Sequence, residues 1–256
     1  MGHTAPRDFA PGAGLFVRYA YPPNRLGYCG PEDVDALVAY GVSEVSDPGL
    51  RRLVTAFEGA YPYLELIAAS AGIRDPLDRR VVEAYWIGNR LLTGVDMAGL
   101  GRSMTERFRS RAGRHWDRVA EAVWAGGLAH HSFHVFAIYP WVGLMREGRI
   151  DEPLQVLDRC RIRWGKVQAV EGSSVSVVCR HLVWSDRALV LTQPQVEIVQ
   201  ASPSVTVEPG DWVSLHWEWV CDTLTPRQLA NLRGFSTHHL RLVNEELAVP
   251  LEAAAG

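Results

Sequence analysis

The sequence predicts an α+β protein in which an all-helical part, residues 1–150, is followed by a small antiparallel β-barrel with a C-terminal helix, residues 151–256. Two observations carry this prediction. Apolar residues recur every three or four positions before residue 150 and every second position in short segments after it. The composition, with 47% hydrophobic and 21% charged residues over 256 positions, is that of a globular chain with one or two domains.

The first part is predicted to be helix after helix because a start signal precedes each apolar stripe. Pro31 with its acidic neighbours opens a helix that ends at Gly41, and Asp47-Pro48 opens a second one that ends at Gly72. Asp75-Pro76 opens a third. Further helices are expected over Met97–Arg111, His115–Trp124 and Ala129–Tyr139, the last of which Pro140 stops.

Alternating polarity predicts the strands of the second part. The segments are Arg161–Trp164, Ser174–Val177, Gln195–Ile198 and Trp212–Trp219, and Gly and Pro residues between them mark turns. Short strands of this kind favour a small antiparallel barrel. The closing helix begins at Thr225-Pro226-Arg227-Gln228, where Thr caps the helix and Gln completes a capping box. Its expected packing face consists of Leu229, Leu232, Phe235, His239, Val243 and Leu247.

Charge and composition exclude several classes of partner. The net charge of −3 and the isoelectric point near 6.3 give no electrostatic reason to expect duplex nucleic acid or an anionic membrane as the main partner. No apolar run approaches the ~20 residues that span a bilayer, and the first residues lack the apolar core of a secretory signal. The four cysteines are far apart, which indicates free thiols. We therefore expect a soluble, cytoplasmic protein.

Two polar residues of the second part are candidates for function. In Trp212–Trp219 the alternation places Val213 and Leu215 on the inward face, so His216 is expected to face outward from a rigid strand. Cys160 lies at the predicted start of the first strand, where its thiol is expected to be accessible. A deprotonated thiol is the soft ligand that transition metals prefer.

The run Cys-Arg-Ile-Arg-Trp-Gly-Lys-Val, residues 160–167, is similar to the start of the HypC/HupF family of hydrogenase assembly chaperones. Chains of that family begin with Cys, three intervening residues, Pro and then Gly-Lys-Val. The resemblance covers about residues 160–247, and it includes Gly210-Asp211-Trp212-Val213, which matches the Gly-Asp-aromatic-Val segment that leads to the family's His, here His216. The residues of the helical part suggest no family.

The resemblance implies a small barrel that holds the iron-dicyano-carbonyl precursor of the nickel-iron site and delivers it to the hydrogenase large subunit. Cys160 would be the thiolate ligand of this iron, and His216 would bind beside it or donate a hydrogen bond. In the family the Cys is the processed N-terminal residue, whereas Cys160 follows a helical part, and Trp164 replaces the family's Pro.

The function implied is that of an accessory protein or chaperone in nickel-iron hydrogenase maturation, and not of an enzyme with turnover. Its expected partners are hydrogenase maturation factors or the immature large subunit, and neither nucleic acid nor a membrane. In the alternative interpretation, the barrel is an interaction module that has lost the metal chemistry.

A second, weaker metal site is predicted in the helical part. His130 and His134 are four residues apart, a spacing that places two imidazoles on one helical face. The candidates for a third ligand are Cys29, whose thiol pKa a helix N-terminus is expected to lower, and Glu83. The alternative function is therefore an enzyme that uses a transition metal, or haem bound through His130, His131 or His134; otherwise these histidines only pack against aromatic neighbours. The segment Tyr19–Tyr28, rich in aromatic residues and Pro, is expected to be a loop packed against the helices.

Overall fold

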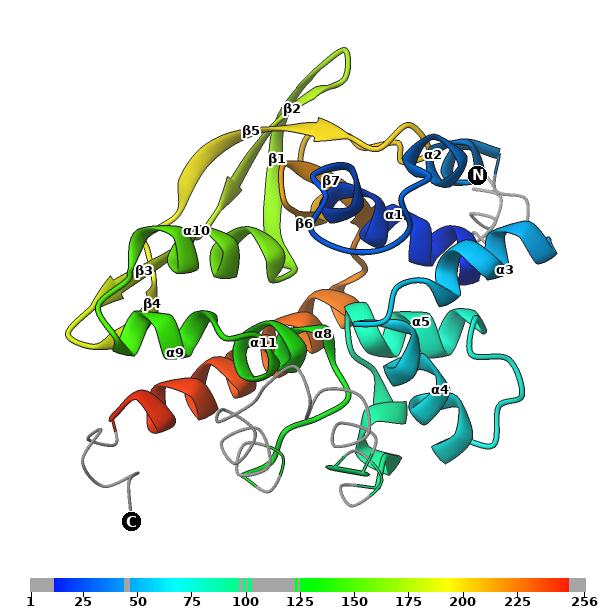
Figure 1. Cartoon of the computed structure of the whole chain (residues 1–256). Coiled ribbons are helices and arrows are strands. Elements are labelled where there is room, and N and C mark those ends of the chain that lie inside the picture. The colour runs from blue at the N-terminus through cyan, green and yellow to red at the C-terminus, as the bar shows by residue number, and fades with distance from the viewer. Residues whose placement is uncertain are drawn as a thin grey trace.

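Helices and a β-barrel pack together in the computed structural model of the chain, which describes residues 12–43, 47–96, 99, 101, 102, 123 and 125–248. In Figure 1 the barrel occupies the upper part, most helices lie below it, and α1 (Gly12–Arg25) runs beside the strands β6 and β7. The predicted α+β class is confirmed. The helices predicted over Met97–Arg111 and His115–Trp124 lie almost entirely outside the described residues.

The early helices follow the predicted start signals, with differences in where they begin and end. Helix α2 (Val34–Ser43) lies where a helix was predicted, but it starts after Pro31 and continues past Gly41, where the end was expected. Helix α3 (Pro48–Thr55) is capped by Asp47, whose Oδ1 accepts a hydrogen bond from Leu50 N at 2.9 Å. The predicted second helix is divided, since α4 (Tyr61–Ser70) starts anew with Pro62 in its first turn, where the missing N–H costs nothing. Helix α5 (Arg79–Trp86) is capped by Asp78 and so starts later than predicted.

Three helices, one of them α9 (Trp141–Arg146), occupy segments for which no helix was predicted. Helix α1 covers most of Tyr19–Tyr28, so the prediction of a loop there is wrong, although Pro22 and Pro23 lie inside the helix. Helix α10 (Asp151–Cys160) ends at Cys160, which therefore closes a helix and does not begin a strand. The remaining short helices are η1 (Arg90–Gly94), α8 (His131–Phe133) and the π-helical η3 (His134–Ile138).

The barrel is closed, with strand order β1-β2-β5-β7-β6 and β6 paired back to β1. Its strands are β1 (Arg163–Glu171), β2 (Ser174–Cys179), β5 (Gln195–Ala201), β6 (Trp212–His216) and β7 (Trp219–Thr223). The expectation of a purely antiparallel barrel is wrong at one place, because β5 and β7 pair in parallel. The predicted strand Trp212–Trp219 is two strands, because the backbone turns at Trp217, where φ is 54°. A separate hairpin, β3 (Leu182–Ser185) and β4 (Ala188–Leu191), was not predicted.

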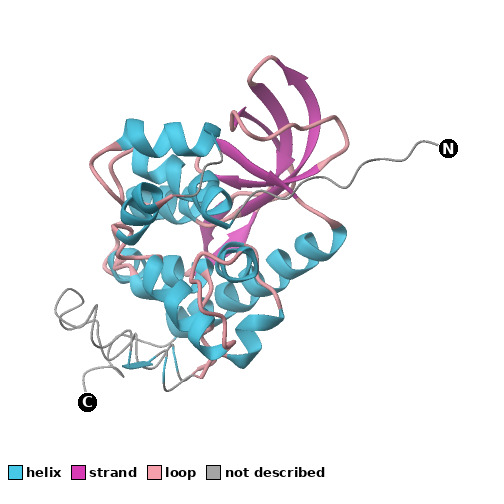
Figure 2. Ribbon diagram, turned by 90° about the vertical axis from the view of Figure 1, so that its right-hand side faces the viewer, coloured by secondary structure: helices cyan, strands magenta, loops and turns pink. Residues whose placement is uncertain are grey.

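The helical part and the barrel share buried contacts. The barrel has its own apolar interior, but Ile162, Cys221 and Leu224 pack into the core of the helices. The closing helix α11 (Pro226–Ala248) adds Leu229 and Leu232 to that core and runs along the helical part (Figure 1). Figure 2 shows the strands gathered on one side of the molecule and most helices on the other.

The predicted start of α11 is confirmed. Gln228 N donates to Thr225 Oγ1 at 3.2 Å, and Thr225 N donates to Gln228 Oε1 at 3.0 Å, which together form the capping box. Of the predicted packing face only Phe235 is incompletely buried. Within the described part of the chain, no helix has both the length and the apolar character needed to cross a bilayer.

Candidate metal centre

The structure brings the two predicted iron ligands together. Cys160 Sγ and one imidazole nitrogen each of His216 and His131 all lie within 4.8 Å of one another. Cys160 comes from the end of α10, His216 from the end of β6, and His131 from the start of α8. The helical part therefore contributes a side chain to a site that the sequence placed in the barrel alone.

His216 is buried, so the prediction that it faces outward is wrong. Its exposed fraction is 0% because α1 and α5 cover this side of β6. The imidazole lies against Trp86 of α5, with ring centroids 5.7 Å apart, and against the ring of His131 at 5.2 Å. The alternation of a strand distinguishes its two faces, but it does not say whether solvent or a helix covers the second one.

A backbone carbonyl of α1 sets the tautomer of His216. Nδ1 donates a hydrogen bond to the Tyr19 carbonyl at 2.6 Å, so Nε2 carries the lone pair. Nε2 is buried and has no hydrogen-bond partner among the described residues. The Tyr19 carbonyl is available because Pro23, four positions further along α1, has no N–H to donate to it. The proline thus helps to set the tautomer of His216.

The ligand atoms are uncharged at neutral pH. Burial lowers the pKa of His131 to about 4 and that of His216 well below its ordinary value. Burial raises the pKa of the Cys160 thiol, and the nearby Cys29 raises it further. A cation that binds here as a thiolate complex must therefore displace the thiol proton.

His131 positions the cysteine. Its Nε2 donates to the Cys160 carbonyl at 2.8 Å, and Tyr85 OH, 3.2 Å from Nδ1, donates to that second nitrogen. Both nitrogens of His131 are therefore engaged in hydrogen bonds, whereas His216 Nε2 is buried without one among the described residues.

Residues 8–250, nearly the whole chain, match a family described as a family of unknown function, DUF6390. The chain belongs to the DUF6390 family. The match spans the helices as well as the barrel and includes Cys160, His131 and His216. No curated protein and no solved structure matches the chain.

In this DUF6390 protein the second predicted metal site is not assembled. His130 precedes α8 and lies with its Nδ1 2.7 Å from Ser132 Oγ, whereas His134 Nδ1 lies 3.2 Å from Tyr63 OH. Because the helix begins only after His130 and widens to a π-helix at His134, the two imidazoles lack the expected helical spacing. Among the described residues, no group of possible metal ligands contains both.

The proposed third ligands also have other surroundings. Burial raises the pKa of Cys29 to about 12, so the expected lowering is wrong. The reason is that α2 begins only at Val34, too far away for its N-terminus to favour the thiolate. Glu83 Oε2 accepts a hydrogen bond from Gln228 Nε2 at 2.9 Å and ties α5 to the start of α11.

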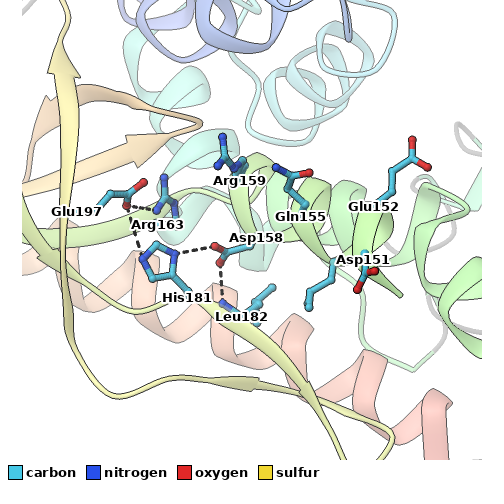
Figure 3. Close-up of a pocket in the computed structure, with 10 residues that line it drawn as sticks. Asp151, Glu152, Gln155, Asp158, Arg159, Arg163, His181, Leu182 and Glu197 are labelled. Carbon is cyan, nitrogen blue, oxygen red and sulfur yellow. Dashed lines mark hydrogen bonds and ion pairs between the residues drawn. The ribbon is translucent and has the colours of Figure 1, made fainter. Parts of the chain in front are cut away.

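A second group of possible ligands was missed from the sequence. Cys179, His181 and Glu197 place one ligand atom each within 4.8 Å of one another. His181 and Glu197 line a pocket of about 570 Å³ whose wall includes residues of α10 (Figure 3). The Cys-Arg-His sequence at residues 179–181 was the one local signal, and Glu197 gave none because it joins from a distant strand.

Proposed function

We propose that the protein is an accessory factor of nickel-iron hydrogenase maturation that holds an iron centre through Cys160 and His216. The observation that carries the proposal is the approach of Cys160 Sγ and one imidazole nitrogen of His216 to within 4.8 Å. These are the two residues that the resemblance to the HypC/HupF chaperones pairs. A thiolate and a neutral imidazole are suitable donors for a low-valent iron centre with cyanide and carbonyl ligands.

The packing of Gly165 in β1 is consistent with the resemblance to the HypC/HupF chaperones. Gly165, of the Gly-Lys-Val sequence, lies in β1 where an added Cβ would come 2.2 Å from Val177 Cγ1. Any larger residue would force the paired strands β1 and β2 apart, which gives a physical reason for Gly at this position. The OB-like or HypC-like identity of the barrel is part of the proposal.

The surroundings of the site suggest how cargo is kept. His131, Tyr85 and Trp86 from the helical part lie around the two ligands and exclude water. Cys160 is half-buried, whereas His216 is buried beneath α1. In our proposal the iron enters from the side of Cys160, and release to a partner involves opening the contact between α1 and β6.

The partners that we propose are other maturation factors or the immature hydrogenase large subunit, in the cytoplasm. The protein would act by binding and transfer, without turnover. In this proposal the helical part surrounds the bound iron with side chains that a barrel alone would not provide.

The test is the iron content of protein purified without oxygen from its native host. We expect iron in the wild type together with infrared bands of cyanide and carbonyl, and loss of both in Cys160→Ala and His216→Ala. Cys179→Ala is the matched control, because this buried thiol of the barrel belongs to a different group of side chains and should not affect the cyanide and carbonyl bands. Circular dichroism checks that each variant is folded.

Two results would contradict the proposal. One is equal iron in Cys160→Ala and the wild type. The other is a Soret band in the purified protein, which would favour the haem alternative.

A further inference from the structure

We propose a second metal site, for a divalent ion of the zinc class, formed by Cys179, His181 and Glu197 and oriented by Asp158. It lies at the end of the barrel next to α10 and opens into the pocket of Figure 3. This site is independent of the proposed iron centre.

The ligand atoms have the separations that one ion requires. Cys179 Sγ lies 3.2 Å from Glu197 Oε2 and 3.7 Å from His181 Nε2. The distance between His181 Nε2 and Glu197 Oε2 is 3.8 Å. Around a tetrahedral zinc ion, with bonds of about 2.0 to 2.3 Å, such ligand atoms are roughly 3.4 to 3.6 Å apart. Movements of a few tenths of an ångström would close the site.

The fold directs these side chains to one place. Cys179 in β2 and Glu197 in β5 have their side chains on the inward side of the paired strands, at the same end of the barrel. His181 stands in the short connection to β3. Only the closed barrel brings the three positions together.

His181 is held in the tautomer that binds metals. Its Nδ1 donates to Asp158 Oδ2 at 2.9 Å, so the lone pair is on Nε2, which faces Cys179 and Glu197. The second N–H of a histidine ligand almost always has such a partner, which is a carboxylate, a backbone carbonyl or water. Asp158 is itself held in place, because its Oδ1 accepts a hydrogen bond from Leu182 N at 2.7 Å (Figure 3). The same oxygen also accepts a hydrogen bond from the Arg161 guanidinium.

Arg163 lies next to the site and is compatible with a cation there. Its guanidinium donates to Glu197 Oε2 and lies 3.9 Å from Cys179 Sγ. A carboxylate has about four lone-pair positions, so Glu197 can bind the ion and Arg163 together. The formation of the Cys179 thiolate on metal binding offsets the added positive charge.

An ion can reach the site from solvent. The side chains of His181 and Glu197 are 26% and 22% exposed and line the pocket of about 570 Å³. Asp151, Glu152 and Arg159 of α10 form another part of its wall. Three protein ligands leave one tetrahedral position, which a water molecule from the pocket can fill.

A nucleophilic cysteine is the competing interpretation of the same residues. Cys179, His181 and Asp158 follow the order of a thiol-imidazole-carboxylate triad. The thiol is buried, however, and Glu197 lies 3.2 Å from the sulfur, where a carboxylate disfavours a free thiolate. Burial and Glu197 raise the pKa of Cys179 to about 12. A carboxylate in this position hinders a nucleophile and completes a metal site.

The test is a Co²⁺ titration of the full-length Cys160→Ala protein after removal of metals with a chelator. This background removes the thiolate of the proposed iron centre. We expect near-ultraviolet charge-transfer absorption from the Cys179 thiolate, together with visible bands of four-coordinate cobalt, saturating at one ion per chain. Cys179→Ser should abolish the charge-transfer band, and Cys221→Ala should leave it unchanged.

Two variants test the rest of the site. Asp158→Asn should keep the band and weaken affinity by about 10- to 100-fold, as expected for a residue that orients a ligand. His181→Ala should weaken binding at least as much, and because its side chain is partly exposed this variant tests the site even if Cys179→Ser does not fold. Absence of the band at millimolar Co²⁺, or unchanged affinity in a folded His181→Ala, would overturn the proposal.

Discussion

A single proline in α1 influences the chemistry of a histidine in the barrel. Pro23 has no N–H, so the Tyr19 carbonyl accepts the proton of His216 Nδ1 and leaves Nε2 as a lone-pair donor. The Cys160 carbonyl accepts a hydrogen bond from His131 Nε2 in the same way. Backbone oxygens therefore orient both imidazoles beside Cys160.

The raised pKa of Cys160 predicts the pH dependence of metal binding. The thiol stays protonated throughout the neutral range and the lowered pKa of His216 keeps its imidazole neutral, so binding releases one proton. Fe²⁺ affinity should rise about tenfold per pH unit between about pH 6 and about pH 8. Competition with a chelator of known affinity measures this slope. A slope near zero would mean that Cys160 is not the ligand, and Cys160→Ser provides the control.

At the scale of the element, a buried chain of hydrogen bonds joins α8 to α11. Leu128 N donates to His239 Nε2 at 3.2 Å, so His239 Nδ1 donates to Ser132 Oγ at 2.7 Å. Ser132 Oγ in turn donates to His130 Nδ1, also at 2.7 Å. His130, one of the two histidines that suggested a metal pair, therefore has a structural role here, and burial lowers its pKa to about 3.

This chain predicts the effect of removing one hydroxyl. Ser132→Ala leaves two buried imidazole nitrogens with a lost partner, so the free energy of unfolding should fall by about 1–3 kcal/mol. Ser236→Ala on α11 is the matched control, because this buried hydroxyl has no hydrogen-bond partner among the described residues. Removal of the Ser236 hydroxyl should leave the free energy of unfolding unchanged or raise it slightly. Urea unfolding of both variants measures the difference, and equal effects would contradict the proposed role of Ser132.

At the scale of the whole molecule, the helices and the barrel depend on each other. The side chains of Cys221, in β7, and of Leu224, just after β7, pack into the core of the helices. Across this contact, Tyr19 OH forms a hydrogen bond with Ser214 Oγ at 2.7 Å. Arg18 and Asp222 form an ion pair at 3.4 Å beside it. The family match over residues 8–250 likewise includes both parts.

We therefore expect the barrel segment not to fold stably alone. A fragment of residues 161–248 exposes Ile162, Leu229 and Leu232, which are buried against helices in the full chain. It should aggregate or lack a cooperative thermal transition, whereas the full chain should unfold in one transition by near- and far-ultraviolet circular dichroism. A monomeric fragment with a sharp transition of its own would show that the barrel is independent.

Local signals predicted many elements but not their limits. The cap at Asp47 and the capping box at Thr225 and Gln228 were readable because each involves residues three apart. The break between α3 and α4 near Pro62 and the turn between β6 and β7 at Trp217 were not predicted. In both segments the apolar periodicity continues across the break, so the pattern gives no sign of it. Helix α1 was missed because its prolines outweighed its apolar stripe.

Patterns in the residues were enough to predict the α+β class and the strand-rich second part, and a family resemblance predicted that Cys160 and His216 act together. The folded chain was needed to show that a helix covers His216, that His131 lies beside Cys160 and that Cys179, His181 and Glu197 converge. Most of these contacts join residues that are far apart along the chain. His216 and Tyr19, which bond each other, are 197 positions apart, and contacts of that separation leave no periodic pattern in the sequence.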